Sequence, residues 1–205
     1  DALRRASLDM RGDKEVVLAA LTQSTNGGAF QYAAPKLRAD KDFVLTAVKQ
    51  NAVAFAYAAD GLRGDKEFVL QVVQENADAL GYAAGHLLSD KEYILQATQK
   101  SEDGRAFKHA AAELCTDKEF VLQATRSNAS AFEYAARGLR SDDEVVLQVV
   151  QESAEGEPFK HAAAELRADR DLVLKAVEQK GKALRYASER LRADEEVVLR
   201  ALMQD

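Results

Sequence analysis

The sequence predicts an all-α fold, an α-solenoid of about seven two-helix (αα-hairpin) repeats of 25 or 27 residues with a half-repeat at each end. A six-residue motif, seen for example at 65–70, returns eight times at this spacing, and strand-type alternation of polar and apolar residues is absent. A near-fixed period of this length is typical of stacked supersecondary units. We therefore expect residues 1–205 to form a single repeat domain. The repeats start at Asp13, Asp40, Asp65, Asp90, Asp117, Asp142, Asp169 and Asp194.

The composition agrees with this fold and narrows the possible partners. The chain is 47% hydrophobic, has two Pro and no Trp, and is rich in residues that favour helices. Its net charge of -6 repels phosphate backbones, so we expect no nucleic-acid binding. No window approaches the roughly 18 consecutive apolar residues of a membrane span, so we expect a soluble chain.

The first helix of each repeat is predicted from the eight motif copies. With the leading Asp numbered zero, positions 3, 4, 7 and 8 are mostly apolar and form one helical stripe, which an invariant Leu at position 5 widens. Position 6 varies between repeats and should face outward. We expect the leading Asp to cap the helix, because its carboxylate can accept from free amides of the first turn. Where Ser89 or Thr116 precedes the Asp, a cap one residue earlier is equally compatible with the sequence.

The second helix is predicted from the pattern Ala-Phe/Leu-x-Tyr-Ala-Ala/Ser-x-x-Leu, seen at 54–62 and 131–139. Pro158 marks its start, since Pro is favoured at the first helical position. The small pair in its middle, such as Ala83 and Ala84, should allow close approach to a neighbouring backbone. Pro35 lies inside the first copy, where we expect it to bend the helix or end it early.

Three insertions fall between the two helices, at 24–28, 101–104 and 153–158. They are polar and contain Gly, as surface loops do, and should lie on one rim of a solenoid. Both ends of the chain interrupt the repeat, because 1–12 match a second helix alone and 194–205 match a first helix alone. Solenoids usually need polar caps, so we expect further chain, a partner subunit or a second copy to cover at least one end. The residues expected to await such a partner are Val197, Val198, Leu199 and Leu202.

Written out in this way, the repeat resembles the family catalogued as domain of unknown function 4116. The family's recurring text reads close to D-K-E-x-V-L-x-A-V-x-x-N-G-x-A-L-x-Y-A-S-x-x-L-R, and the segment 169–192 follows it most closely. The residues in register there are Gly181, Ala183, Leu184, Tyr186, Ala187, Ser188, Leu191 and Arg192. The resemblance implies an α-helical repeat protein of bacteria, algae and protists with no catalytic residues to carry over. His109 and His161 depart from it by replacing Tyr.

One candidate partner-binding surface is a ladder of aromatic or imidazole groups, one in each repeat. Such a row could line a groove and hold a peptide or extended ligand. The alternative is that each ring packs between repeats while its polar tip reaches water or a backbone carbonyl. The ladder comprises Tyr32, Tyr57, Tyr82, His109, Tyr134, His161 and Tyr186.

A second candidate is a ladder of Arg residues at the end of the second helix. An acidic partner could bind along it, or each Arg could complement the helix dipole and pair with acidic groups that open the next repeat. The ladder comprises Arg11, Arg38, Arg63, Arg140, Arg167 and Arg192, and Leu88 and Cys115 interrupt it.

The sequence predicts no enzyme, metal site or cofactor. The three His residues are too far apart in the repeat to converge, and a zinc site needs three or four ligands. Cys115 is the single cysteine, which excludes an internal disulfide, and the repeat places no His or Asn beside it to activate the thiol.

We therefore expect a noncatalytic scaffold or protein-binding subunit, an accessory piece of a larger assembly that binds a protein partner or self-associates through its uncapped ends. Its compartment would be the cytoplasm or an organelle such as a plastid, as the family resemblance implies. One alternative is a regulatory or targeting repeat region of a larger enzyme or effector. Another is a reader of single-stranded RNA, which the acidic charge opposes.

Overall fold

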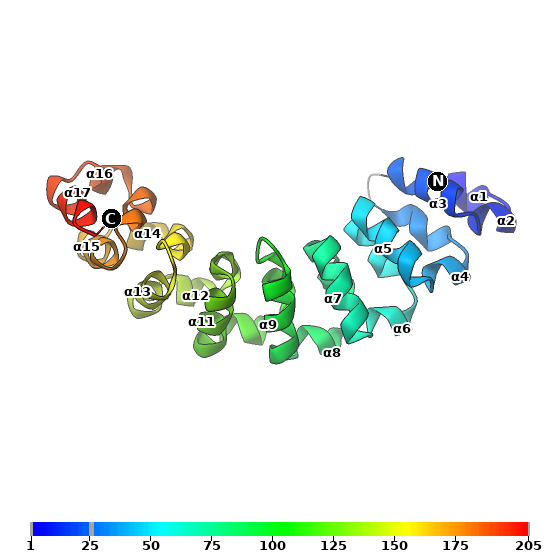
Figure 1. Cartoon of the computed structure of the whole chain (residues 1–205), viewed down its shortest axis with the longest axis horizontal. Coiled ribbons are helices and arrows are strands. Elements are labelled where there is room, and N and C mark those ends of the chain that lie inside the picture. The colour runs from blue at the N-terminus through cyan, green and yellow to red at the C-terminus, as the bar shows by residue number, and fades with distance from the viewer. Residues whose placement is uncertain (1, 25–26, 205) are drawn as a thin grey trace. The chain divides into compact units, whose positions relative to one another are not determined.

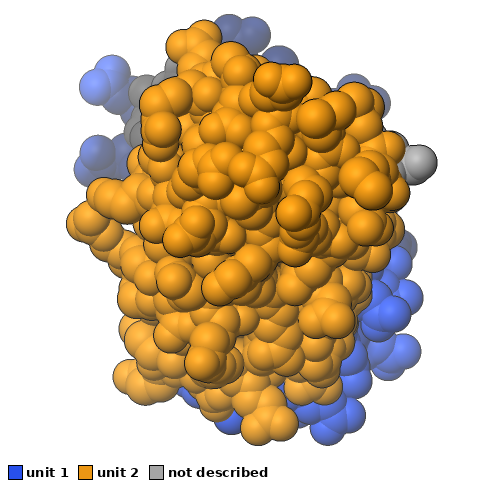
Figure 2. Space-filling view, turned by 90° about the vertical axis from the view of Figure 1, so that its left-hand side faces the viewer, with its two compact units in different colours: residues 1–109 blue, residues 110–205 orange. Residues whose placement is uncertain are grey.

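The computed structural model describes residues 2–24 and 27–204, and every regular element in these two ranges is helical (Figure 1). This confirms the all-α repeat fold. The chain divides into two compact units, unit 1 ending at His109 and unit 2 beginning at Ala110, which Figure 2 distinguishes by colour.

Each repeat begins with a long α-helix of nearly constant length. These helices are α3 (Lys14–Thr22), α5 (Lys41–Gln50), α7 (Lys66–Glu75), α9 (Lys91–Lys100), α11 (Lys118–Ser127), α13 (Asp143–Glu152), α15 (Arg170–Gln179) and α17 (Glu195–Leu202). The leading Asp is the N-cap of all eight, and its carboxylate accepts from the backbone N–H three residues later. The structure thus confirms the predicted cap and places it on the Asp rather than on Ser89 or Thr116.

The predicted stripe forms the core. In α7, Phe68, Val69, Val72 and Val73, which occupy positions 3, 4, 7 and 8, are at most 1% exposed. The invariant Leu at position 5, here Leu70, flanks the stripe and is half-buried. Successive long helices contact one another within each unit, from α3 to α9 in unit 1 and from α11 to α17 in unit 2. Apolar burial along these contacts is the main stabilising term.

The second arm of the repeat differs from the prediction, because it is not one helix. It consists of a 3₁₀-helix followed by a single turn of α-helix. The 3₁₀-helices are η1 (Gly28–Tyr32), η2 (Ala52–Tyr57), η3 (Ala77–Tyr82), η4 (Arg105–His109), η5 (Ala129–Tyr134), η6 (Glu157–His161) and η7 (Gly181–Tyr186). The short α-helices after them are α4 (Pro35–Arg38), α6 (Asp60–Arg63), α8 (Gly85–Leu88), α10 (Ala112–Thr116), α12 (Arg137–Arg140), α14 (Ala164–Arg167) and α16 (Glu189–Arg192), and α1 (Ala2–Arg5) and α2 (Leu8–Arg11) precede α3.

The break falls at the small pair. Ala58 is extended at φ -62° and ψ 157°, and Ala59 has φ -57° and ψ 142°, so the helix stops at both. The freed N–H of Ala59 instead donates to the carbonyl of Arg38 in the preceding repeat, at 2.8 Å. The same bond recurs between other repeats of each unit, for example from Ala163 to the carbonyl of Arg140 at 2.8 Å. Small side chains are needed here because two backbones meet, as the sequence predicted.

The arm does end before Pro35, as expected, but the same break in repeats without Pro shows that Pro35 is not its cause. It is the first residue of α4, directly after the break, where its missing N–H has no helical partner to lose. Pro158 lies in the first turn of η6 and confirms the predicted start of the second arm.

The three insertions connect a long helix to the following 3₁₀-helix, as predicted. Each contains a glycine with positive φ directly before the 3₁₀-helix, at Gly27, Gly104 and Gly156. A left-handed residue turns the chain sharply into the 3₁₀-helix, and Gly adopts it without steric cost. Thr25 and Asn26 of the first insertion lie outside the described residues.

Candidate partner-binding surfaces

The Tyr/His ladder lies at one repeated place, the last residue of each 3₁₀-helix. All of its members are half-buried. In unit 1 they are Tyr32, Tyr57, Tyr82 and His109, and in unit 2 they are Tyr134, His161 and Tyr186. Successive 3₁₀-helices contact one another within each unit, so ladder members of one unit lie on adjacent elements. Use of this row by a partner stays a prediction.

The two imidazoles of the ladder are held in poorly solvated places. Burial lowers the pKa of His109, and the neighbouring Lys108 lowers it further, while Asp78 opposes the shift. The carboxylate of Asp78 lies 3.7 Å from Nε2 of His109, which is longer than a hydrogen bond. Burial likewise lowers the pKa of His161, with Lys160 adding to the effect. Both rings therefore favour the neutral form near pH 7.

The Arg ladder joins consecutive repeats. Arg63 donates from Nη1 to the carbonyl of Tyr82 in the next repeat at 3.5 Å, and Arg167 donates to that of Tyr186 at 3.4 Å. Arg140 makes the equivalent contact with the carbonyl of His161 at 3.5 Å. Among the described ion pairs, none joins a ladder Arg to the acidic group that opens the next long helix.

These guanidinium groups are therefore partly occupied within the stack. Arg140 also donates from Nε to the carbonyl of Ala135 at 3.1 Å, and Arg167 to that of Ala162 at 3.2 Å. Arg63 pairs instead with a carboxylate of its own short helix, Asp60, at 2.5 Å. An acidic partner along this ladder would have to compete with such contacts.

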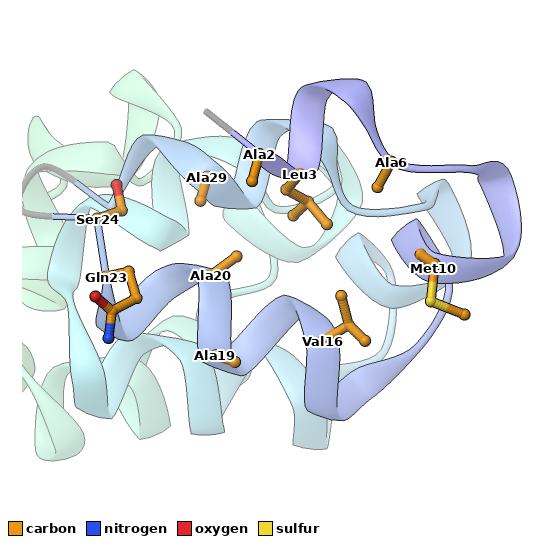
Figure 3. Close-up of a pocket in the computed structure, with 10 residues that line it drawn as sticks. All are labelled: Ala2, Leu3, Ala6, Met10, Val16, Ala19, Ala20, Gln23, Ser24 and Ala29. Carbon is orange, nitrogen blue, oxygen red and sulfur yellow. The ribbon is translucent and has the colours of Figure 1, made fainter.

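An apolar groove of about 510 Å³ opens at the N-terminal end of unit 1 (Figure 3). Val16 and Ala20 of α3 project toward Leu3 and Ala6 across it. Met10 borders the groove and is 44% exposed. This groove was not predicted from the sequence. The repeat pattern already contained the information needed to predict it. Positions 3 and 7 of each long helix face the long helix before it, and in the described chain no long helix precedes α3.

The long helix α17 of unit 2 exposes an apolar face. Leu199 is 54% exposed and Leu202 66% exposed, as predicted for residues that await a partner, and Val198 is half-buried. The prediction was wrong for Val197, which is fully buried. Val197 occupies position 3, which faces the preceding repeat, whereas Val198 and Leu202 at positions 4 and 8 face the side on which a following repeat would lie.

The profile of a family described as Domain of unknown function (DUF4116) matches the chain in six overlapping stretches: 24–63, 65–115, 101–140, 117–167, 142–192 and 169–205. Together these stretches span most of the sequence. The chain belongs to the DUF4116 family. A search of curated proteins and a search of solved structures returned no match.

In this DUF4116 chain the repeated residues serve the fold. The leading Asp of the repeat motif caps the long helix, its Tyr ends a 3₁₀-helix and its Arg contacts the next repeat. The residues of the family motif therefore stabilise the stacked repeats. Surfaces that can distinguish this chain from others of its kind are those where the repeat varies or is interrupted, namely position 6, which is exposed except at the half-buried Gln148, the insertions and the two end faces.

The described residues of this DUF4116 chain do not bring metal-ligating side chains together. No cluster of three or more His, Cys, Asp or Glu side chains there could hold a metal ion. Cys115 is half-buried, and burial raises the pKa of its thiol, which disfavours the nucleophilic thiolate. No helix in the described part of the chain is long and apolar enough to cross a membrane.

Proposed function

We propose that this chain is a noncatalytic helical-repeat scaffold that binds a protein partner as an accessory piece of a larger assembly. The observation that carries the proposal is its apolar end surfaces. The groove beside α3 is lined mainly by Ala, Leu, Val and Met side chains, and α17 exposes Leu199 and Leu202. Contiguous apolar surface of this kind is typical of interaction sites.

The distribution of charged groups supports the same proposal. Carboxylates and basic side chains recur in structural roles, as helix caps and as bridges between repeats, so they are committed to stacking. A catalytic site needs dissimilar groups brought into mutual contact. Binding through surface shape and apolar contact needs only a rigid frame with variable positions, which a repeat stack supplies.

Affinity purification from the source cells tests this proposal. The tagged chain should retain a protein partner that is identified by mass spectrometry and then reconstituted from purified components. Two variants, Ala20→Glu in the groove and Leu199→Glu/Leu202→Glu on α17, should each be compared with the unaltered chain, and at least one should lose the reconstituted complex. The proposal fails if the chain is a stable monomer and if every protein that it retains is also retained by both variants.

A further inference from the structure

We propose that the Tyr ladder of unit 1 binds an extended segment of a partner protein that is rich in Pro and acidic residues. The surface consists of Tyr32, Tyr57 and Tyr82 together with Arg38, and we call it the tyrosine face. The segment would form a polyproline II helix with Pro at every third residue and Asp or Glu between. The inference rests on the proposed function of protein binding and adds a surface other than the two end faces.

The hydroxyl groups of these three Tyr residues are left free by the fold. Tyr32, Tyr57 and Tyr82 are half-buried at the ends of successive 3₁₀-helices that contact one another. Within the described residues their hydroxyls form no hydrogen bond, and none of the three oxygens is buried. Tyr93, whose ring serves the core, is 2% exposed and donates to the carbonyl of Lys66 at 3.3 Å. The tyrosine face therefore presents hydrogen-bond donors that the stack does not use.

The residue directly before each ladder ring differs between the units. Before the three Tyr of unit 1 it is uncharged, and before the three rings of unit 2 it is charged. In unit 1 these residues are Gln31, Ala56 and Gly81, and in unit 2 they are Glu133, Lys160 and Arg185. The guanidinium group of Arg185 lies 5.1 Å from the centroid of the Tyr186 ring and occupies one face of it. An apolar ring such as that of Pro meets no such charged side chain in unit 1.

The charge beside the rings favours an acidic partner. In η1, α4, η2 and α6 the basic residues are Lys36, Arg38 and Arg63, and the one acidic residue, Asp60, pairs with Arg63 at 2.5 Å. Neither Lys36 nor Arg38 forms an ion pair with a described residue. Arg38 donates to the carbonyl of Tyr57 at 3.5 Å, which places its guanidinium group beside the tyrosine face. Carboxylates of a docked segment would compensate this positive charge.

The spacing of the rings matches a polyproline II helix. This helix has three residues per turn and rises 3.1 Å per residue, so every third residue returns to the same side after about 9 Å. Long helices in contact pack with their axes about 8–10 Å apart, which sets a similar spacing for equivalent residues of successive repeats.

The hydrogen-bonding groups of such a segment also fit the tyrosine face. Its backbone carbonyls are free to accept from Tyr hydroxyls, because a polyproline II helix has no internal hydrogen bonds. Strand addition, another way to hold an extended segment, needs the edge of a sheet, and the described part of the chain contains no strand. A proline-rich segment is therefore the extended ligand that this face suits best.

Synthetic peptides test the inference on the intact chain. The probe repeats the triplet Pro-Glu-Gln four times and carries fluorescein at its N-terminus. A charge control replaces each Glu of the probe with Lys. A spacing control has the composition of the probe but places its Pro residues at irregular intervals.

Fluorescence anisotropy should show saturable binding of the probe. The charge control should bind about tenfold more weakly, because it brings like charges to Lys36 and Arg38, and the spacing control should also bind more weakly. Tyr57→Phe/Tyr82→Phe keeps both rings and should weaken binding about threefold to tenfold for each lost hydroxyl. The matched control Tyr93→Phe should leave binding unchanged, since it removes a hydroxyl from the core instead. Circular dichroism of each variant verifies that it is folded.

Four results would overturn the inference. They are a lack of saturable binding to the folded protein, equal binding of either control peptide, unchanged binding in Tyr57→Phe/Tyr82→Phe, and displacement of the probe by single-stranded RNA at lower concentrations than by unlabelled peptide. The last result would make RNA the occupant. If the peptides fail but the purified partner still binds, only the inference about the tyrosine face fails and the proposed function stands.

Discussion

Unit 1 and unit 2 repeat the same succession of long α-helix, 3₁₀-helix and short α-helix but differ along the edge where the long helices begin. In unit 1 three Lys residues each pair with the capping Asp of the next repeat at 2.5–2.7 Å. In unit 2 Lys118 reaches Glu144 at 3.6 Å instead, and Arg170 contacts both Asp194 and Glu196. The first residue of the long helix is basic in six of the eight repeats. The two exceptions are Asp143 in α13 and Glu195 in α17.

The rings along this edge differ in the same way. In unit 1 the three Lys side chains lie 5.3–5.9 Å from the ring centroids of Phe43, Phe68 and Tyr93 at position 3 of the next repeat. Unit 2 has Val145, Leu172 and Val197 at position 3 after Phe120, so no ring is present there to receive a cation. The apolar stripe therefore maintains the stack while the residues along this edge can change, because exposed ion pairs contribute little to stability.

Removal of a core ring should give the largest effect and should separate the two units. Phe55 of unit 1 and Phe132 of unit 2 occupy equivalent positions and are fully buried. Each change to Ala should reduce the free energy of unfolding by about 3–5 kcal/mol through the cavity it leaves. Hydrogen exchange measured by mass spectrometry should show faster exchange mainly in the unit that carries the change. Equal acceleration in both units would show that they unfold as one cooperative block.

The Arg contacts between repeats should give the next largest effect. Arg140→Ala removes hydrogen bonds to the carbonyls of Ala135 and His161 and should cost about 1–2 kcal/mol. Cys115 occupies the ladder position in the first repeat junction of unit 2, where its carbonyl accepts from Ala136 N–H at 2.9 Å and its side chain carries no guanidinium. Cys115→Arg should therefore stabilise unit 2, by less than Arg140→Ala destabilises it. Urea unfolding measures both, and a destabilised Cys115→Arg protein would contradict a bridging role.

The edge chemistry should give a smaller effect that depends on salt. Lys41→Gln removes the ion pair with Asp65, and Asp143→Lys gives unit 2 the basic residue that it lacks opposite Asp169. The first change should cost, and the second should gain, about 0.2–1 kcal/mol at low ionic strength. Thermal unfolding in low and high salt measures both, and both differences should shrink as salt screens the charges. A gain that persists in high salt would point to packing rather than charge.

The pH dependence should give the smallest effect and should be similar in the two units. The pKa of His109 in unit 1 and that of His161 in unit 2 are both lowered by burial, so the unfolded chain binds protons more readily. The stability that the neutral rings contribute is present above about pH 6.5 and is lost as pH falls through the folded-state pKa values. His161→Tyr, which restores the repeat's usual residue, should reduce this loss in unit 2 alone. Unit-resolved hydrogen exchange between pH 7 and pH 5 checks it.

Several features of the structure could be predicted from the sequence because they depend on local chemistry. The Asp caps follow from the preference of a carboxylate for free amides, and the buried positions of α7 follow from helical periodicity. The break at Ala58 and Ala59 could not be predicted, because it depends on a hydrogen bond to Arg38 of another repeat. The same long-range contact explains why Pro35 fits where a continuous helix would have been bent.

The candidate surfaces show a similar division. The exposed Leu199 and Leu202 were visible in the sequence as apolar residues of an unfinished repeat. The burial of Val197 and the groove beside Val16 could not be predicted from the sequence. Periodicity identifies the apolar stripe but does not show which half of it faces the preceding repeat.

The repeat, its caps and its apolar stripe follow from residue types at fixed spacing, and the acidic charge follows from composition. The division of the second arm, the contacts of the Arg ladder and the groove beside α3 are seen only in the folded chain. Those features arise from contacts between repeats, which form only when the units stack.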